Sequence, residues 1–246
     1  MTLIKVENLE KSFGDRKILN NLTFQVLAGE ILFILGQSGT GKSVLLKCLV
    51  GLLIPEKGKI IIDQFDLTGR LEKDFQEVRR KCAMVFQNPA LFDSLTVEEN
   101  IAFGLHRLTT FNKMEINNKI KKAVESVQLS IKILHKKPNE LSYGQQKRVS
   151  LARSLVLEPE ILLFDEPTTG LDPVSTTAIN RLIGYISKEY KTTSLVVSHD
   201  IQCAFEIAQR VLFLDKGQVI YNDSIQNIHL SKQPLVQQFF QEIQLK

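Results

Sequence analysis

A glycine-rich segment near the N-terminus ends in a lysine and a serine, a spacing suited to holding a phosphate. It lies between an apolar run and a stretch with helical spacing. Glycines let the backbone turn so that its N–H groups, with a helix N-terminus behind them, surround a phosphate. We expect Lys42 to contact the β- and γ-phosphates and the Ser43 hydroxyl to bind Mg²⁺. The residues of this loop are Gly36, Gln37, Ser38, Gly39, Thr40, Gly41, Lys42 and Ser43.

Two carboxylates follow another apolar run later in the chain. Residues 161–164 read Ile-Leu-Leu-Phe, and Asp165 and Glu166 come next. In an open α/β sheet, ligands bind beyond the carboxyl ends of the strands, where these side chains would lie. We expect Asp165 to hold Mg²⁺, directly or through water, and Glu166 to orient and deprotonate an attacking water.

The elements that must position these residues follow from the spacing of apolar side chains. Alternating apolar and polar residues at 3–9 and 22–26 predict antiparallel strands, and helices are predicted at 42–50 and 119–128. Continuous apolar runs separated by helical patterns indicate a mostly parallel sheet that is covered on both faces. The predicted buried strands are 31–35, 161–164, 195–197 and 211–214.

A phosphate loop alone is compatible with small-molecule kinases, GTPases, RecA-like motors and transporter ATPases. A GTPase needs a guanine-reading Asn-Lys-x-Asp segment, whereas residues 112–115 read Asn-Lys-Met-Glu, which argues against that class. Residues 141–145 read Leu-Ser-Tyr-Gly-Gln and precede a helical stretch. Here the sequence resembles the ATP-binding cassette (ABC) family, whose signature at this place is L-S-G-G-Q.

The other motifs of that family occur in the family's order. By resemblance, Phe13 would stack on adenine, Gln87 would lie near the γ-phosphate, and His199 would contact the γ-phosphate or the attacking water. Residues 170–172, Gly-Leu-Asp, match the family's D-loop. The resemblance thus implies catalytic roles for Glu166, His199 and Gln87. It implies metal ligands at Ser43, Gln87 and Asp165. Nucleotide contacts are implied for the phosphate loop, residues 36–43, and for Phe13, Ser142, Gly144, Gln145 and Asp172.

The resemblance also implies a fold and an assembly. The fold is an α/β P-loop NTPase with a RecA-like parallel-sheet core, an N-terminal antiparallel β subdomain and an inserted helical subdomain that carries the signature. We expect the ATP-binding domain at 1–222, its helical subdomain at about 88–158, and a C-terminal helical extension at 223–246. In this family two cassettes pair head to tail, and each ATP lies between the phosphate loop of one and the signature of the other.

One residue departs from the family's signature. Tyr143 stands in place of the first glycine, which adds a Cβ and disfavours a positive φ. We expect the side chain to obstruct the approach of the phosphate and to weaken the closed dimer; the alternative is that its ring or hydroxyl supplies a compensating contact to the partner's phosphate loop or to the ribose.

A finer resemblance concerns the class of transporter. Residues 43–47, 90–97 and 234–239 are similar to the ATPases of Mla/MCE systems, which move phospholipid between bacterial membranes. This similarity implies as partners a second ATPase subunit, an integral-membrane permease, an MCE lipid-binding protein and a small accessory protein. The alternatives are a small-solute importer of the amino-acid type, an ABC protein that works without a permease, and a purely structural nucleotide-binding module.

Composition sets the remaining bounds. Lys plus Arg is 31 and Asp plus Glu is 27, and this charge of +4 is too weak to argue for nucleic acid. The three cysteines form no metal or disulfide pattern. We expect no secretion signal and no membrane span, so the chain would be cytoplasmic and would reach a membrane only through partners.

Residues 105–137 form a basic stretch, with eight Lys or Arg against Glu115 and Glu125. This excess of positive charge indicates either a solvated helical face or a surface that binds lipid headgroups or a partner.

The last residues show a short apolar stripe. Leu235, Val236, Phe239, Phe240 and Ile243 recur at helical spacing. The stripe predicts either a helix that packs on its own domain or a contact with another subunit.

Overall fold

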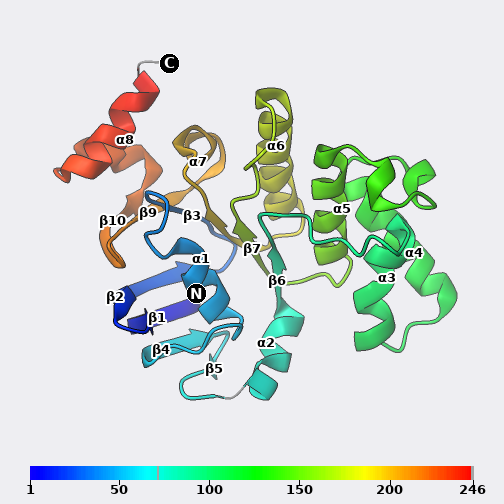
Figure 1. Ribbon diagram of the computed structural model, residues 1–246, viewed down its shortest axis with the longest axis horizontal. Coiled ribbons are helices and arrows are strands. Elements are labelled where there is room, and N and C mark those ends of the chain that lie inside the picture. Colours follow the sequence, from blue (N-terminus) through cyan, green and yellow to red (C-terminus); the bar gives the residue numbers. More distant parts are fainter. Residues whose placement is uncertain (71, 245–246) are drawn as a thin grey trace.

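The computed structural model describes residues 1–70 and 72–244, which form two sheets surrounded by helices (Figure 1). The strands are β1 (Thr2–Phe13), β2 (Arg16–Leu27), β3 (Ile31–Leu35), β4 (Lys57–Ile62), β5 (Phe65–Asp66), β6 (Cys82–Val85), β7 (Ile161–Asp165), β8 (Thr193–Val197), β9 (Arg210–Asp215) and β10 (Gln218–Ser224). The helices are α1 (Lys42–Leu49), α2 (Gln76–Lys81), α3 (Val97–Leu108), α4 (Lys113–Ser126), α5 (Tyr143–Leu155), α6 (Pro173–Glu189), α7 (Ile201–Ile207) and α8 (Pro234–Gln244).

A six-stranded sheet lies at the centre, in the order β10-β9-β3-β8-β7-β6. Only β10 runs antiparallel to its neighbour, and the other pairs are parallel. The strands β7 and β8 are buried at every residue, because helices cover both faces of the sheet. The four predicted buried strands are confirmed to within two residues at each end. The short β6 and the half-exposed β10 were not predicted, although residues 82–86 form an apolar run; β10 mixes apolar and polar residues.

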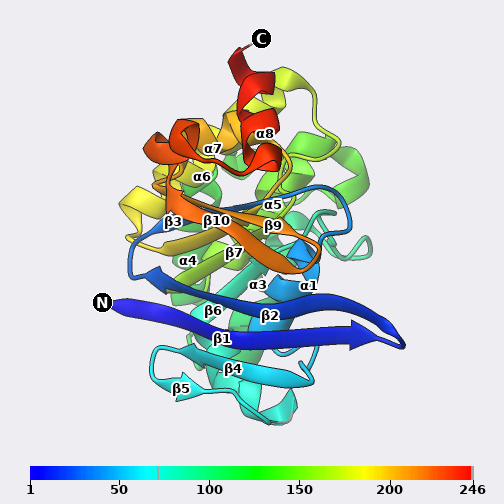
Figure 2. The same ribbon diagram turned by 90° about the vertical axis from the view of Figure 1, so that its left-hand side faces the viewer.

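A second, antiparallel sheet has the order β2-β1-β4-β5, and Figure 2 shows its long strands below β9 and β10. The predicted antiparallel strands pair with each other as β1 and β2. Helix α1 packs into a core shared by the two sheets, where its Leu45 and Leu49 meet Val6 of β1 and Leu163 of β7. The start of α1 is therefore held between both sheets.

Helices α3, α4 and α5 pack together beside the β6 edge of the sheet (Figure 1). Each begins with a capping box, in which the side chains of Thr96, Asn112 and Ser142 accept hydrogen bonds from the first turn. The apolar side chains Ile101, Ile120 and others of this group join one continuous core with the central sheet. The helix predicted at 119–128 is confirmed as part of α4.

The surface of this helical group accounts for much of the basic stretch. Lys119 and Lys122 of α4 form ion pairs with Glu158 at 2.9 and 3.3 Å. This arrangement corresponds to a solvated helical face. Among residues 1–70 and 72–244, no helix is both long enough and apolar enough to cross a membrane.

Helix α8 packs on its own domain. Val236 is fully buried, and the Phe239 ring lies 5.4 Å from the Phe213 ring of β9. Phe240 lies 6.1 Å from Phe205 of α7. The apolar stripe thus packs on its own domain, which is the first of the two interpretations. The side chain of Ile243 lies outside the described residues.

Candidate nucleotide site

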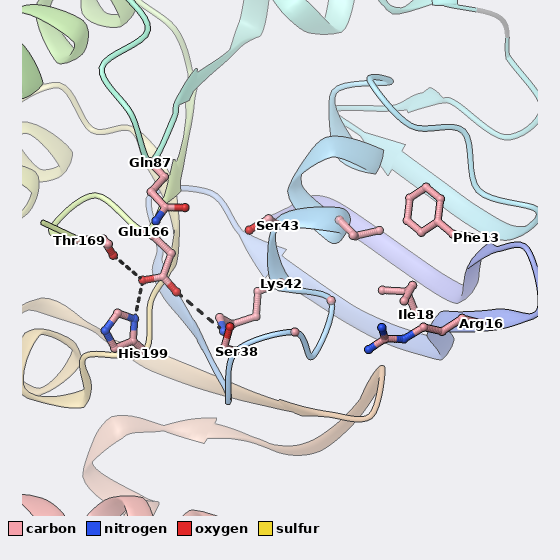
Figure 3. Close-up of a pocket in the computed structure, with 13 residues that line it drawn as sticks. Phe13, Arg16, Ile18, Ser38, Lys42, Ser43, Gln87, Glu166, Thr169 and His199 are labelled. Atoms are coloured by element: carbon pink, nitrogen blue, oxygen red, sulfur yellow. Dashed lines mark hydrogen bonds and ion pairs between the residues drawn. The ribbon is translucent and has the colours of Figure 1, made fainter.

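A cavity of about 620 Å³ opens at the carboxyl edge of the central sheet, a size suited to a small-molecule ligand (Figure 3). In Figure 3, Phe13, Arg16 and Ile18 lie at one end, and Gln87, Glu166 and His199 lie at the other. The residues that line the cavity are Phe13, Arg16, Ile18, Ser38, Gly39, Gly41, Lys42, Ser43, Val44, Gln87, Glu166, Thr169 and His199.

The phosphate loop leaves β3 and enters α1 through Gly36 and Gly41, at which a side chain would clash with neighbouring residues. A Cβ on Gly36 would lie 2.3 Å from the carbonyl oxygen of Leu214, and one on Gly41 would lie 2.8 Å from Leu19. Gly41, directly before α1, has a φ of 103°. The loop backbone therefore lies close to the backbone of Leu214 and the side chain of Leu19. Its N–H groups and the start of α1 form one concave surface.

Lys42 is the first residue of α1 and is almost fully buried. Its ammonium donates to the carbonyl oxygens of Gly36 at 2.8 Å and Gln37 at 3.0 Å. It also lies 3.8 Å from the carboxylate of Glu166. Burial lowers the pKa of Lys42, and the charges of Glu166 and Asp165 oppose that shift. Two carbonyl groups of the phosphate loop thus hold the Lys42 ammonium in position.

Ser43 and Asp165 meet across the floor of the site. The Ser43 hydroxyl donates to Asp165 Oδ1 at 2.6 Å, which joins the start of α1 to the end of β7. Asp165 itself does not line the cavity but lies directly behind it, and it is buried. A hydroxyl and a carboxylate are hard oxygen donors, so their chemistry fits Mg²⁺.

Glu166 follows β7 and turns sharply toward the cavity. Its φ of 49° places it in the left-handed region, and its N–H donates to Val197 of β8 at 2.9 Å. Its carboxylate accepts hydrogen bonds from the Thr169 hydroxyl at 3.2 Å and from His199 Nδ1 at 2.7 Å. An ionised carboxylate only accepts hydrogen bonds, so His199 carries a proton on Nδ1 and presents its other nitrogen elsewhere.

Some of the predicted nucleotide contacts lie beside this cavity rather than in it. Gln37 and Thr40 line a neighbouring hollow of about 350 Å³, and Gly36 lies at the base of the loop. Conversely, four residues that line the cavity were not predicted. Val44 directly follows the phosphate loop, whereas Arg16, Ile18 and Thr169 lie outside it. No sequence motif marks these three, because only the fold brings them to the site.

The signature residues form a separate surface. Ser142, Gly144 and Gln145 line a hollow of about 360 Å³ at the start of α5, apart from the phosphate loop. Ser142 caps α5 by accepting a hydrogen bond from the N–H of Gln145. Asp172 caps α6, where it accepts hydrogen bonds from the N–H and hydroxyl of Ser175. Within one chain, these four residues do not reach the cavity.

One of the two reasons for expecting Tyr143 to obstruct the phosphate, a disfavoured positive φ, does not hold in the structure, whereas the effect of its bulk between two chains stays a prediction. Tyr143 is the first residue of α5 and is absent from the residues with a positive φ. Its ring packs inside its own chain, where a Cβ placed on Gly170 would be 3.4 Å from the ring. The backbone strain expected from replacing a glycine is therefore missing.

A phosphate loop on a buried strand, together with a Ser–Asp pair and a Glu–His pair at the same sheet edge, defines a nucleoside triphosphatase of the P-loop class. The chain belongs to the ABC transporter family, whose model matches residues 19–169, more than half of its length. It is thus the ATP-binding, ATP-hydrolysing subunit of an ABC transporter.

Similar proteins differ in their transport roles. The probable ribonucleotide transport ATP-binding protein mkl of Mycobacterium leprae is 39% identical over 96% of this chain and 68% of its own length. The intermembrane phospholipid transport system ATP-binding protein MlaF of Haemophilus influenzae is 36% identical over 96% of this chain and 89% of its own length. A solved dimeric cassette, MJ0796 bound to ADP and Pi, has a TM-score of 0.83 at 30% identity and covers 91% of this chain and 99% of its own.

Proposed function

We propose that this ATPase drives the movement of phospholipid between membranes together with an Mla-type permease and an MCE lipid-binding protein. The observation that carries the proposal is the similarity to the Haemophilus influenzae phospholipid transport protein over 89% of that protein's length. The resemblance of residues 43–47, 90–97 and 234–239 to Mla/MCE ATPases adds support. The assembly would contain two copies of this chain and a small accessory protein, and no nucleic acid. It would lie on the cytoplasmic face of the membrane, bound through the permease.

For hydrolysis, we assign the general base to Glu166. His199 would hold the carboxylate and a water in line, and Gln87 would contact the γ-phosphate from the same end of the cavity. Phe13, half exposed at the end of β1, would stack on adenine at the far end of the cavity. Lys42 would exchange its loop carbonyls for the β- and γ-phosphates.

Mg²⁺ fits the oxygen donors at the floor of the site. Ser43 and Gln87 would hold it directly, and Asp165 would hold it directly or through water. When bound, the ion would neutralise phosphate charge. The hydrogen bond between Ser43 and Asp165 already brings two of these donors together.

Because the signature lies apart from the cavity, we propose that it completes the site of a second copy. Ser142, Gly144 and Gln145 stand at the N-terminus of α5, where the positive end of the helix dipole attracts a phosphate. Asp172 would support the same interface from the start of α6. The dimeric solved cassette is a precedent for such pairing.

We propose that residues 90–97 dock on the permease. Phe92 is 42% exposed, while its backbone is held on both sides by Asn100, which accepts from its N–H at 2.8 Å and donates to its carbonyl at 3.1 Å. Arg153 donates to the carbonyl of Ala90 at 2.8 Å. The loop thus presents an aromatic side chain on a rigid support close to Gln87.

The catalytic assignment is tested with two variants of the full chain. Glu166→Gln should keep ATP affinity while turnover falls about 10²–10⁴-fold, since a positioned base contributes on that order. Lys42→Ala should instead weaken ATP binding, because its charge neutralises the phosphate oxygens. Phosphate release and equilibrium binding are measured separately. Normal turnover by Glu166→Gln would remove Glu166 from this role.

The transport assignment is tested by co-purifying the permease from detergent-solubilised membranes and identifying its bound molecule by mass spectrometry. We expect a phospholipid and an MCE protein. The similarity to a ribonucleotide transport protein favours a second candidate, a small-solute importer. A nucleotide-type or amino-acid-type solute bound to the permease would overturn the lipid proposal and support that candidate.

A further inference from the structure

A buried lysine, Lys147, lies behind the loops that carry Gln87 and Glu166, and neither nucleotide binding nor hydrolysis as described uses it. Lys147, in the second turn of α5, is 3% exposed. Its ammonium donates to the carbonyl oxygen of Gln87 at 2.5 Å and to that of Pro167 at 3.0 Å. One cation therefore joins α5 to two loops that are far apart in the sequence.

Both of these loops carry side chains of the cavity. Gln87 itself lines the cavity, and Pro167 directly follows Glu166, whose backbone holds a left-handed conformation. The first carbonyl belongs to the peptide unit that follows Gln87, and the second belongs to the peptide unit between Pro167 and Thr168, one residue beyond Glu166. A displacement of either peptide unit would be transmitted to the amide of Gln87 or to the carboxylate of Glu166.

The tyrosine that replaces the signature glycine covers this lysine. The Tyr143 ring centroid lies 5.4 Å from the Lys147 ammonium, one helical turn away, which is a cation–π geometry. The ring also lies near Gly170, where an added Cβ would be 3.4 Å from it. Tyr143, itself 38% exposed, thus lies over the ammonium and beside the D-loop.

The charge of Lys147 lacks a direct counterion. No carboxylate of the described residues is paired with it at ion-pair distance, although the charge of Glu166 acts on it from the cavity side. Burial lowers the pKa of Lys147 to about 8. The titratable groups facing this region are the Glu166 carboxylate and the Tyr143 phenol, with Lys42 and His199 bound to the far side of Glu166.

We propose that Lys147, covered by Tyr143, is a positioning residue that holds Gln87 and the turn after Glu166 at the separation which ATP hydrolysis requires. The proposal rests on the catalytic role proposed for Glu166. It makes Tyr143 a part of the catalytic support within one chain, in place of an obstruction between two chains.

The test compares two cations that donate to backbone carbonyls. Lys147→Met removes the bridge, and Arg79→Met is the control, because Arg79 donates to the carbonyls of Val50 and Gly51 outside the cavity. We expect both variants to lower the unfolding temperature. Only Lys147→Met should lower kcat for ATP at least 10-fold, with KM within about 3-fold of wild type. Equal kcat losses in the two variants, or a change in KM alone, would overturn the proposal.

Conservative variants give an independent readout. Lys147→Arg keeps the charge and the donors and should restore at least a third of kcat, and Lys147→Gln serves if the methionine variant does not fold. Failure of Lys147→Arg to restore kcat would contradict the role of the bridge.

Tyr143 and Glu166 complete the design. Tyr143→Gly should lower kcat at least 3-fold, and Tyr143→Phe should keep it, because the ring alone covers the ammonium. If Glu166→Gln hydrolyses ATP normally, both the catalytic assignment and this proposal fail. If Glu166→Gln is inactive while Lys147→Met and Tyr143→Gly turn over like wild type, only the proposal for Lys147 fails.

Discussion

Replacing Gly144 by alanine should stabilise the single chain and weaken ATP-dependent pairing. Gly144 lies in the first turn of α5, and a Cβ there would meet only the Ser175 hydroxyl at 3.8 Å, an ordinary contact. Alanine is favoured over glycine in a helix by roughly 0.5–1 kcal/mol. For a chain of this length, that gain corresponds to about 1–4 °C in the unfolding midpoint.

The same Cβ would point into the hollow that is proposed to receive the partner's γ-phosphate. We expect the ATP concentration needed for half-maximal dimerisation to rise at least 10-fold. The assay is light scattering after gel filtration, in a Glu166→Gln background so that ATP is not consumed. Thermal unfolding without nucleotide measures the stability of the single chain.

Gly184→Ala is the contrasting control. It lies within α6, but its Cβ would be 2.9 Å from Ile207, so the same substitution should lose stability instead of gaining it. Pairing of the folded fraction should stay at the level of the background protein. Unchanged pairing in Gly144→Ala would refute the placement of the signature at the shared phosphate, and lower stability would refute the contact geometry of α5.

Three other outcomes are expected. Phe92→Asp should leave basal ATP hydrolysis within 2-fold but abolish permease-coupled transport; normal assembly and transport would place the docking surface elsewhere. Phe239→Ala should lower the free energy of unfolding by about 2–4 kcal/mol, measured with urea, since its ring packs on the central sheet. The thiols of Cys48, Cys82 and Cys203 should resist alkylation at pH 8 until the chain unfolds, because burial raises the pKa of the first two to about 12 and that of the third as well.

The parts of the site that could be predicted are those encoded by contiguous residues. The phosphate loop and the pair Asp165–Glu166 each combine an apolar strand with a polar end, so that one local pattern contains both the position and the chemistry. The signature, a contiguous segment as well, was instead identified through its resemblance to the ABC family's motif. In each case the neighbouring strand or helix also followed from periodicity.

The residues that could not be predicted act through contacts made by the fold. Lys147 has the sequence context of an ordinary helical lysine, and only the packing of α5 against two loops buries it. Tyr143 was expected to strain the backbone, because a glycine in the family motif suggests a positive φ, yet the helix starts there with ordinary geometry. Thr169 reaches Glu166 only because the turn after β7 folds back.

The order of strands in the central sheet has a consequence for biosynthesis. The strand that carries the phosphate loop pairs on one side with β8 and on the other with β9, so that Ile34 contacts Val197 and Leu212. The ribosome produces these partners long after residues 36–43. Pairing over such a separation is slow, because a long loop must close first. A nascent chain should therefore acquire ATP binding only when β9 has left the exit tunnel, and until then its apolar N-terminal strands would depend on chaperones.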